Sequence, residues 1–125
     1  MAKRSRIPRE YPVAEIIDIH DGDTIRMCVD VGFDAILRKW IRFRDVRAPE
    51  LREAGGVEAK QELVMMLNQH APDGFVTLTT FWTPGSYKEI NEEKTFIRYI
   101  GDIVTLDHVN ANQYMRGLGY VDQGV

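Results

Sequence analysis

Two short segments of the sequence contain the side chains that could carry out chemistry. The first places Asp21 and Asp23 on an Asp-Gly turn between two strand-like runs. The second places Arg42 within a strand and Glu50 just beyond its end. Carboxylates bind hard cations, arginine binds phosphate through paired hydrogen bonds, and glutamate can take a proton from water. Together these residue types are the set that metal-assisted hydrolysis of a phosphodiester requires.

The length and composition are those of one globular domain. The chain has 125 residues, of which 44% are hydrophobic, and its single cysteine, Cys28, excludes an intramolecular disulfide. No apolar run is long enough to cross a membrane, and the basic N-terminus lacks the apolar stretch of a secretory signal. We therefore expect a cytoplasmic protein without a membrane segment, and we expect it to be a monomer.

Positive charge is dense in two stretches, although the whole chain is acidic with a net charge of −3. One stretch is the basic tail, residues 1–10, and the other covers residues 38–47. A protein that coats nucleic acid nonspecifically is usually basic, so any contact with a polyanion must here be local. We expect the tail to precede a single domain formed by residues 11–125.

Alternating apolar and polar residues predict five strands, and helical spacing predicts two helices. The expected strands cover 13–19, 24–31, 35–46, 75–82 and 96–104, with a polar loop from 84 to about 93. One helix is expected over 57–69, between the third and fourth strands, and a second over about 108–116 with Asp107 as its N-cap. This order predicts an α+β fold, a five-stranded barrel of the OB type with two packed helices.

The motifs, in their order along the chain, resemble those of the staphylococcal nuclease (thermonuclease) family. The resemblance runs from about Val13 to Val121 and rests on Asp21-Gly22-Asp23-Thr24, Arg42, Ala48-Pro49-Glu50, Gly56-Val57-Glu58-Ala59, Arg98, Val109-Asn110 and Arg116-Gly117-Leu118. It implies a five-stranded OB barrel with packed helices. It also implies calcium-dependent hydrolysis of phosphodiester bonds in DNA and RNA, which leaves 3′-phosphates.

The resemblance also implies a role for each matching catalytic residue. Arg42 and Arg98 match the two arginines that hold the scissile phosphate. Glu50 matches the glutamate that acts as general base or orients the attacking water. These three residues are therefore the expected catalytic set.

The implied metal ligands match less completely. Asp23 matches a calcium-ligand aspartate, Ala48 matches the position that offers a backbone carbonyl, and Asp21 matches a nearby acid that supports the site. The family's second calcium-ligand aspartate is replaced here by Arg47. A guanidinium group cannot bind a metal, because it has no lone pair available for one. Calcium is still the expected cofactor, but its site lacks one charged ligand.

Three hypotheses could account for Arg47. Asp45 lies two residues earlier and would share its side of a strand, so a local shift could make Asp45 the replacement ligand. Alternatively, Arg47 contacts the phosphate of the substrate and partly replaces the cation electrostatically. In the third hypothesis, Arg47 pairs with Asp23 or Glu50 and locks the site shut.

Aromatic side chains could add contacts to bases, with ordinary packing as the alternative. The candidates are Trp40, Phe81, Trp82, Tyr87 and Tyr99, of which Tyr99 follows Arg98 and is taken as a substrate-binding residue. Two functions from different classes remain open, beside a structural or assembly role for which the sequence gives no positive argument. One is a calcium-dependent endonuclease that hydrolyses DNA or RNA. The other is a nuclease-like module that has lost catalysis and binds nucleic acid or a protein partner.

Overall fold

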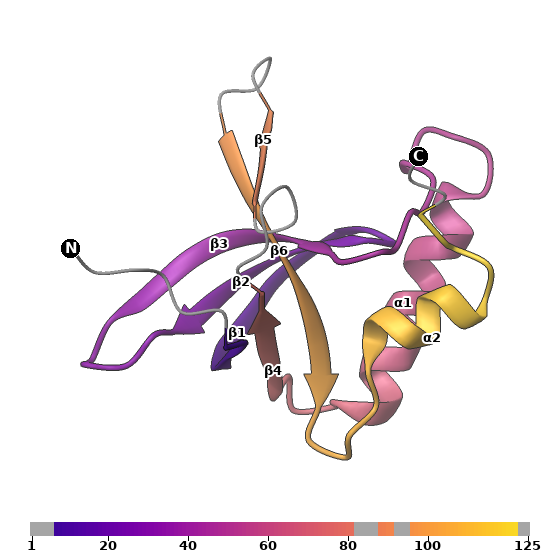
Figure 1. Ribbon diagram of the computed structural model, residues 1–125. Coiled ribbons are helices and arrows are strands. Elements are labelled where there is room, and N and C mark those ends of the chain that lie inside the picture. The colour runs from indigo at the N-terminus through magenta and orange to yellow at the C-terminus, as the bar shows by residue number, and fades with distance from the viewer. Residues whose placement is uncertain (1–6, 82–87, 92–95, 123–125) are drawn as a thin grey trace.

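The computed structural model describes residues 7–81, 88–91 and 96–122, and it contains a closed barrel with two helices packed beside it (Figure 1). The barrel strands are β1 (Arg9–Asp21), β2 (Thr24–Asp30), β3 (Ile36–Phe43), β4 (Val76–Thr80) and β6 (Phe96–Thr105), and the remaining elements are β5 (Lys88–Asn91), α1 (Gly56–His70) and α2 (Ala111–Gly117). The α+β class and the five-stranded OB-like barrel expected from the sequence are confirmed.

The barrel closes because its two outermost strands pair with each other. Antiparallel pairing gives the order β3-β2-β1-β4-β6, and a parallel pairing between β3 and β6 completes the circle. Strand β1 is long enough to serve two partners, since its first residues pair with β4 and its later residues pair with β2. Register shifts along its pairing with β2 bend the strand, as bulges do in small barrels.

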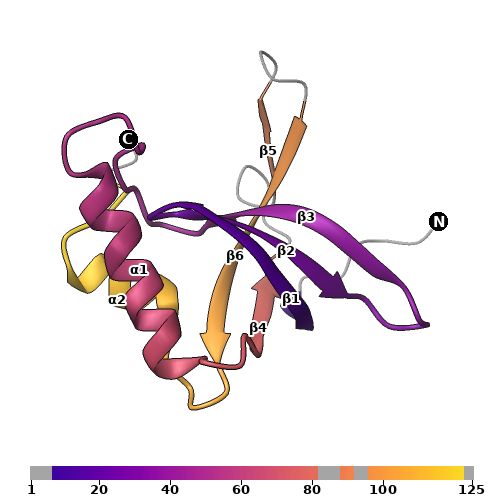
Figure 2. The same cartoon turned by 180° about the vertical axis from the view of Figure 1, so that it is seen from behind.

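Strand β5 corrects one expectation from the sequence. It lies within the stretch that the sequence predicts to be a polar loop, and it pairs with the first half of β6. Both views show β5 and the paired part of β6 projecting away from the rest of the barrel (Figures 1 and 2). A short polar strand at a sheet edge has little apolar patterning, so alternation could not reveal it.

Three boundaries differ from expectation by three residues or more. Strand β1 begins at Arg9, four residues before the expected strand and within the expected tail, and the other two are the end of β3 and the start of α2. Strand β3 ends at Phe43, three residues early, because Asp45 has a φ of 59°, which a strand cannot contain. Helix α2 begins at Ala111, and its N-cap is Asn110, whose side chain accepts a hydrogen bond from the Gln113 N–H at 3.0 Å. Asp107, the expected cap, instead accepts a hydrogen bond from the Thr105 hydroxyl and lies 2.8 Å from a ring nitrogen of His70.

The core lies inside the barrel and under the two helices. Helix α1 packs against β1 and α2 through the buried side of its apolar stripe, which includes Ala59, Leu63 and Met66. The buried apolar cluster comprises Val13, Ile25, Met27, Val29, Ile41, Phe43, Val46, Leu63, Met66, Leu67, Val76, Leu78, Ile103, Ala111 and Met115. No helix among the described residues is long and apolar enough to cross a membrane.

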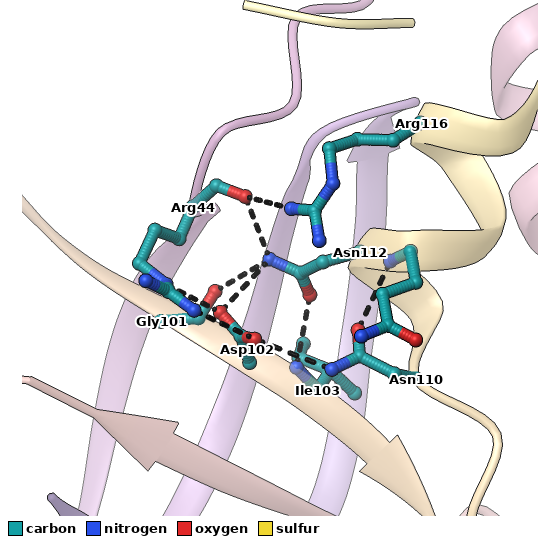
Figure 3. Close-up of polar contacts among 8 residues, drawn as sticks. Arg44, Gly101, Asp102, Ile103, Asn110, Asn112 and Arg116 are labelled. Carbon is teal, nitrogen blue, oxygen red and sulfur yellow. Dashed lines mark hydrogen bonds and ion pairs between the residues drawn. The ribbon is translucent and has the colours of Figure 1, made fainter. Parts of the chain in front are cut away.

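One buried side chain, Asn112, joins α2 to the barrel (Figure 3). Its carbonyl oxygen accepts a hydrogen bond from the Ile103 N–H at 3.0 Å. Its amide nitrogen donates to the carbonyl oxygens of Arg44 and Gly101, each at 3.0 Å. Arg44 is the first residue after β3. Asn112 therefore fixes the start of the loop that leads from β3 towards α1.

The same loop is held by ionic contacts. The Arg44 guanidinium donates to both carboxylate oxygens of Asp102, at 2.9 and 3.3 Å, in the two-pronged geometry that arginine favours. Arg116 of α2 donates to the Arg44 carbonyl oxygen at 3.2 Å, as Figure 3 shows. The ring of Phe81, one of the aromatics considered for base stacking, lies against the Arg44 guanidinium, with its centroid 4.1 Å from Cζ. These contacts anchor the loop at its first residue.

We expect Asn112→Leu to lower the free energy of unfolding by about 3 kcal/mol or more, because each buried backbone group that it leaves unsatisfied costs about 1–3 kcal/mol. Urea denaturation of both proteins measures the difference. Gln113→Leu is the matched control, because Gln113 is the next residue and is exposed, and its effect should stay within about 0.5 kcal/mol. Equal destabilisation by the two substitutions would show that the Asn112 network has no special role.

Candidate functional site

Residues from separate parts of the chain line one polar cavity of about 320 Å³. They come from the β1–β2 turn, from β3 and β6, from the loop between β3 and α1, and from the segment after α2. The lining residues are Asp21, Asp23, Arg42, Arg47, Ala48, Glu50, Glu53, Arg98 and Asp122. All of the expected site residues except Asp45 and Tyr99 are therefore brought together here.

Asp23 connects the first motif to the second. One of its carboxylate oxygens accepts a hydrogen bond from the Ala48 N–H at 2.9 Å, and the other accepts from the Thr24 hydroxyl at 2.9 Å. The Asp23 backbone carbonyl also accepts from the Phe43 N–H at 2.8 Å. The carboxylate is buried, and a guanidinium nitrogen of Arg42 lies 3.9 Å from it. These bonds attach the Asp-Gly turn to the last residue of β3, Phe43, and to Ala48 in the loop that follows.

Asp21 is the second buried carboxylate of the turn. One of its oxygens accepts a hydrogen bond from the Asp23 N–H at 3.1 Å. Burial, followed by the hydrogen bond and the negative charge of the Asp23 side chain, raises the pKa of Asp21 to about 7. Two adjacent carboxylates in a buried site favour either a shared proton or a bound cation.

The raised pKa predicts a pH dependence of stability in the presence of a chelator. The folded protein keeps a proton on Asp21 that the unfolded chain loses above its ordinary pKa of 3.8. The free energy of unfolding should therefore fall as pH rises from about 4 to about 7. Urea denaturation across this range should show a flatter dependence for Asp21→Asn. The control Asp18→Asn, an exposed carboxylate on β1, should keep the slope of wild type. Parallel curves for wild type and Asp21→Asn would contradict the prediction.

Gly22 allows the turn to approach the loop and α1 closely. A Cβ atom at this position would lie 2.7 Å from the Ala48 Cβ and 2.9 Å from the Ala59 Cβ. Real Cβ atoms do not come this close, so a larger residue would push the turn outward. The small residues at these three positions therefore bring the carboxylates of the turn up to the loop before α1.

Arg42 and Arg98 reach the cavity from neighbouring strands. Their side chains lie on the outside of the barrel, because the alternate residues Ile41 and Tyr99 face its interior hollow. A guanidinium nitrogen of Arg42 donates to the Val46 carbonyl oxygen at 3.3 Å, and this side chain is 19% exposed. The parallel pairing of β3 with β6 therefore places two guanidinium groups beside the same cavity.

Glu50 lies at the open side of the cavity, with 58% of its side chain exposed. Its carboxylate accepts a hydrogen bond from Arg52 at 3.1 Å, and its backbone N–H donates to the Glu53 carboxylate at 2.9 Å. The Glu50 carbonyl also packs so closely on Gly56, the first residue of α1, that no side chain would fit there. The loop carrying Glu50 is thus attached to the helix that follows it.

Arg47 is exposed and lines the same cavity. Its backbone N–H donates to the Tyr120 carbonyl oxygen at 3.3 Å, and the preceding residue, Val46, forms an isolated bridge with Val121. The segment after α2 therefore runs along the loop that carries Arg47. This pairing brings in Asp122, a carboxylate that the motifs did not select.

Asp122 and Glu53 are the cavity residues that sequence reasoning missed. Asp122 is remote from the motifs, and only the pairing of its backbone N–H with the Asp45 carbonyl oxygen, at 3.3 Å, brings it close. No local pattern signals such a pairing. Glu53 lies three residues after Glu50, and its hydrogen bond to the Glu50 N–H resembles a capping interaction that spacing could have suggested.

Two expected site residues lie elsewhere. Asp45 is exposed and outside the lining of the cavity, because its positive φ ends the alternation that would have placed it beside Arg47. Tyr99 lines a separate hollow of about 200 Å³ together with Ile41, and the Lys39 ammonium lies 5.4 Å from its ring. Trp82 and Tyr87 lie outside the described residues.

The net charge of the cavity favours binding of a cation. Its five carboxylates outnumber its three guanidinium groups, an excess of two negative charges when all are ionised. No three His, Cys, Asp or Glu side chains within the described ranges are arranged as metal ligands. The hard oxygen donors Asp21 and Asp23 nevertheless suit calcium, which takes carboxylate and carbonyl oxygens. A divalent cation would also offset the burial of the Asp21 carboxylate and its repulsion by Asp23, both of which raise the pKa of Asp21.

No protein-family model matches the chain, and a search of curated proteins finds no similar sequence. The cavity and its motifs are therefore the features from which a function can be inferred.

Proposed function

We propose that this protein is a calcium-dependent nuclease that hydrolyses phosphodiester bonds in DNA or RNA. The observation that supports this most is the shared cavity of the acids and arginines that the two motifs contain. These residues are Asp21, Asp23, Arg42, Ala48, Glu50 and Arg98. They are also the residues that the resemblance to the staphylococcal nuclease family selects.

In the proposed reaction, Arg42 and Arg98 bind the non-bridging oxygens of the scissile phosphate. Each guanidinium can donate two parallel hydrogen bonds, and negative charge grows on these oxygens as water attacks phosphorus. The Val46 carbonyl and the Asp23 carboxylate beside Arg42 restrict its side chain to the cavity. Binding by arginines that are already in place avoids reorganisation when the charge develops.

Glu50 takes the proton of the attacking water in this proposal. The water oxygen bonds to phosphorus, the P–O5′ bond breaks, and the 5′-oxygen leaves as a hydroxyl after taking a proton from solvent. A general base must reach both solvent and substrate, and the half-exposed Glu50 carboxylate lies beside the cavity and in solvent. The hydrogen bond from Arg52 restricts where this carboxylate can point.

Asp21, Asp23 and the Ala48 carbonyl are the groups that would hold calcium. When bound there, the ion would polarise a phosphate oxygen as a Lewis acid. Asp21 must lose its proton before it can serve as a ligand, so its raised pKa makes calcium binding weaker below about pH 7.

A digestion assay tests this function. Purified protein is incubated with single-stranded DNA in calcium, in excess chelator, and in chelator with calcium restored. We expect cleavage in the first and third samples only. Cleavage that persists at full rate in chelator would contradict the role of the cation, and absence of cleavage in all three would contradict the nuclease proposal.

Arg47 favours a second candidate, a module that binds nucleic acid without cleaving it. Its exposed guanidinium lines the cavity beside Arg42 and Arg98, so three arginines could bind a phosphate without a metal. This candidate predicts that an oligonucleotide binds equally well in calcium and in chelator and stays intact in both. The digestion assay therefore separates the two candidates.

A further inference from the structure

A row of cationic and aromatic side chains leads away from the cavity across the outside of the barrel. In the pairing of β3 with β6, Trp40 lies opposite Arg98, which lines the cavity. In the pairing of β2 with β3, Trp40 lies opposite Arg26. Paired strands lie about 4.8 Å apart, so Trp40 is one strand spacing from Arg98 and Arg26 is two. A group bound at Arg98 is thus a direct neighbour of the tryptophan.

The tryptophan ring is held in position by two neighbours. The Arg26 Cζ lies 5.4 Å from the ring centroid, within the range of a cation–π contact. The ring of His20 lies edge-on to it, with centroids 5.7 Å apart and an angle of 81° between the planes. Trp40 is only half-buried despite these contacts. A large aromatic ring that is already fixed loses little entropy when a ligand binds it.

The surroundings of Trp40 are more cationic than the acidic chain as a whole. On β3 the outward positions alternate as Arg38, Trp40 and Arg42, and β2 contributes Arg26. Acidic residues stand at both ends of this row, because Asp18 on β1 lies opposite Arg26 and Glu89 on β5 pairs with Arg98. Aromatic rings between cationic groups are the arrangement that binds single-stranded nucleic acid, by stacking bases and contacting phosphates.

One hydrogen-bond donor of the Arg26 guanidinium is unsatisfied within the described part of the chain. Its Nε atom is buried and has no hydrogen-bond partner among the residues that the structure describes. Buried donors are nearly always satisfied, so a missing partner calls for an explanation. Because Nε itself is covered, a phosphate near Trp40 would contact the terminal nitrogens of the half-buried Arg26 side chain.

We infer that the row of Arg26, Trp40 and Arg98 is a subsite for one unpaired nucleotide next to the phosphate in the cavity. The base stacks on Trp40, and the following phosphate contacts Arg26. This inference rests on the proposed function, because the phosphate bound at Arg98 sets the position of the base. It specifies the substrate as single-stranded, since a base within a duplex is already stacked on its neighbours.

Fluorescence anisotropy of a labelled single-stranded oligonucleotide tests the stacking contact. The titrations are made in chelator, so that no cleavage interferes. Trp40→Leu is expected to weaken binding by about tenfold or more, and Trp40→Phe should recover most of the affinity. Phe75→Leu is the matched control, because Phe75 is an exposed aromatic residue just before β4, and it should bind like wild type.

An abasic oligonucleotide of equal length separates stacking from phosphate contacts. Trp40→Leu should bind it as well as wild type does, because no bases remain to stack. Equal weakening on the normal and abasic strands, or no weakening on either, would overturn the inference. If wild type cleaves DNA but Trp40→Leu binds the oligonucleotide with the affinity of wild type, the result supports the nuclease proposal and contradicts the subsite. If wild type does not cleave DNA but Trp40→Leu loses affinity for the normal strand only, the result supports the subsite and contradicts the nuclease proposal.

A second variant keeps the inference testable if Trp40→Leu does not fold. Arg26→Gln should weaken binding to both strands, and the slope of log K against log salt should fall by about one, as expected for one lost phosphate contact. Lys60→Gln on α1 is the matched charge control and should leave the slope unchanged. An unchanged slope in Arg26→Gln would overturn the phosphate contact.

Discussion

Replacing Arg42 with alanine is expected to lower the rate of calcium-dependent cleavage of single-stranded DNA by about a hundredfold to a thousandfold. Removing one hydrogen-bond donor that faces a developing charge in a water-poor site lowers turnover by about this factor. Arg42 lies in the cavity beside the buried carboxylate of Asp23 and is 19% exposed, so water cannot fully replace its guanidinium. Initial rates at saturating DNA measure the effect on turnover.

Three comparisons make this result specific. Arg42→Lys keeps the charge but loses the planar pair of donors, so most of the loss should remain. Arg9→Ala is the matched control, because Arg9 is an exposed arginine at the opposite end of β1 from Asp21. At that end β1 pairs with β4, which contributes no residue to the cavity lining. Urea denaturation shows whether Arg42→Ala remains folded. Full activity in a folded Arg42→Ala protein would remove this residue from the mechanism.

Replacing Arg47 with aspartate is expected to tighten calcium binding by about tenfold to a hundredfold and to increase cleavage. The change removes a positive charge from the cavity and adds an oxygen ligand. Two unit charges 4 Å apart interact by about 4 kcal/mol at an effective dielectric of 20, and the exposure of Arg47 reduces this value. Calorimetric titration with calcium measures the affinity.

Two further variants separate the possible causes. Arg47→Ala removes the charge without adding a ligand, so its affinity should lie between those of wild type and Arg47→Asp. Asp45→Ala should bind calcium like wild type, because Asp45 lies outside the cavity. Weakened binding in Asp45→Ala would instead support its role as the replacement ligand. Identical calcium affinity in wild type and Arg47→Asp would show that position 47 does not limit the metal site.

The barrel could be predicted from the sequence because its strands bury one face each. Ile25, Met27 and Val29 alternate with polar residues along β2, and all three are buried in the core. The same rule fails for β5, which pairs with β6 alone and has a polar sequence. The sequence alone does not identify the cap of α2, because Asp107 and Asn110 are both good capping residues. Only the contacts of Asp107 with Thr105 and His70 distinguish them.

The cavity could be predicted as far as its residues belong to local motifs. Asp23, Arg42 and Glu50 lie on a turn, a strand and a loop that the pattern of the chain identifies, and they line one cavity. Asp45 could not be placed, because alternation assumes a strand that its positive φ ends. Asp122 lies at the cavity because the segment after α2 pairs through its backbone with the loop after β3. No pattern in the sequence indicates this pairing.

The most direct test of the central claim compares single-turnover cleavage by wild type and Glu50→Gln, each purified identically and assayed in calcium and in chelator. Glu50→Gln keeps the shape of the side chain but cannot accept a proton from water, and such bases contribute about a hundredfold or more. The proposal predicts rapid cleavage by wild type in calcium alone, with at least about a hundredfold loss in Glu50→Gln. Equal rates for the two proteins in calcium would contradict it, because hydrolysis would then occur without the base that this cavity provides.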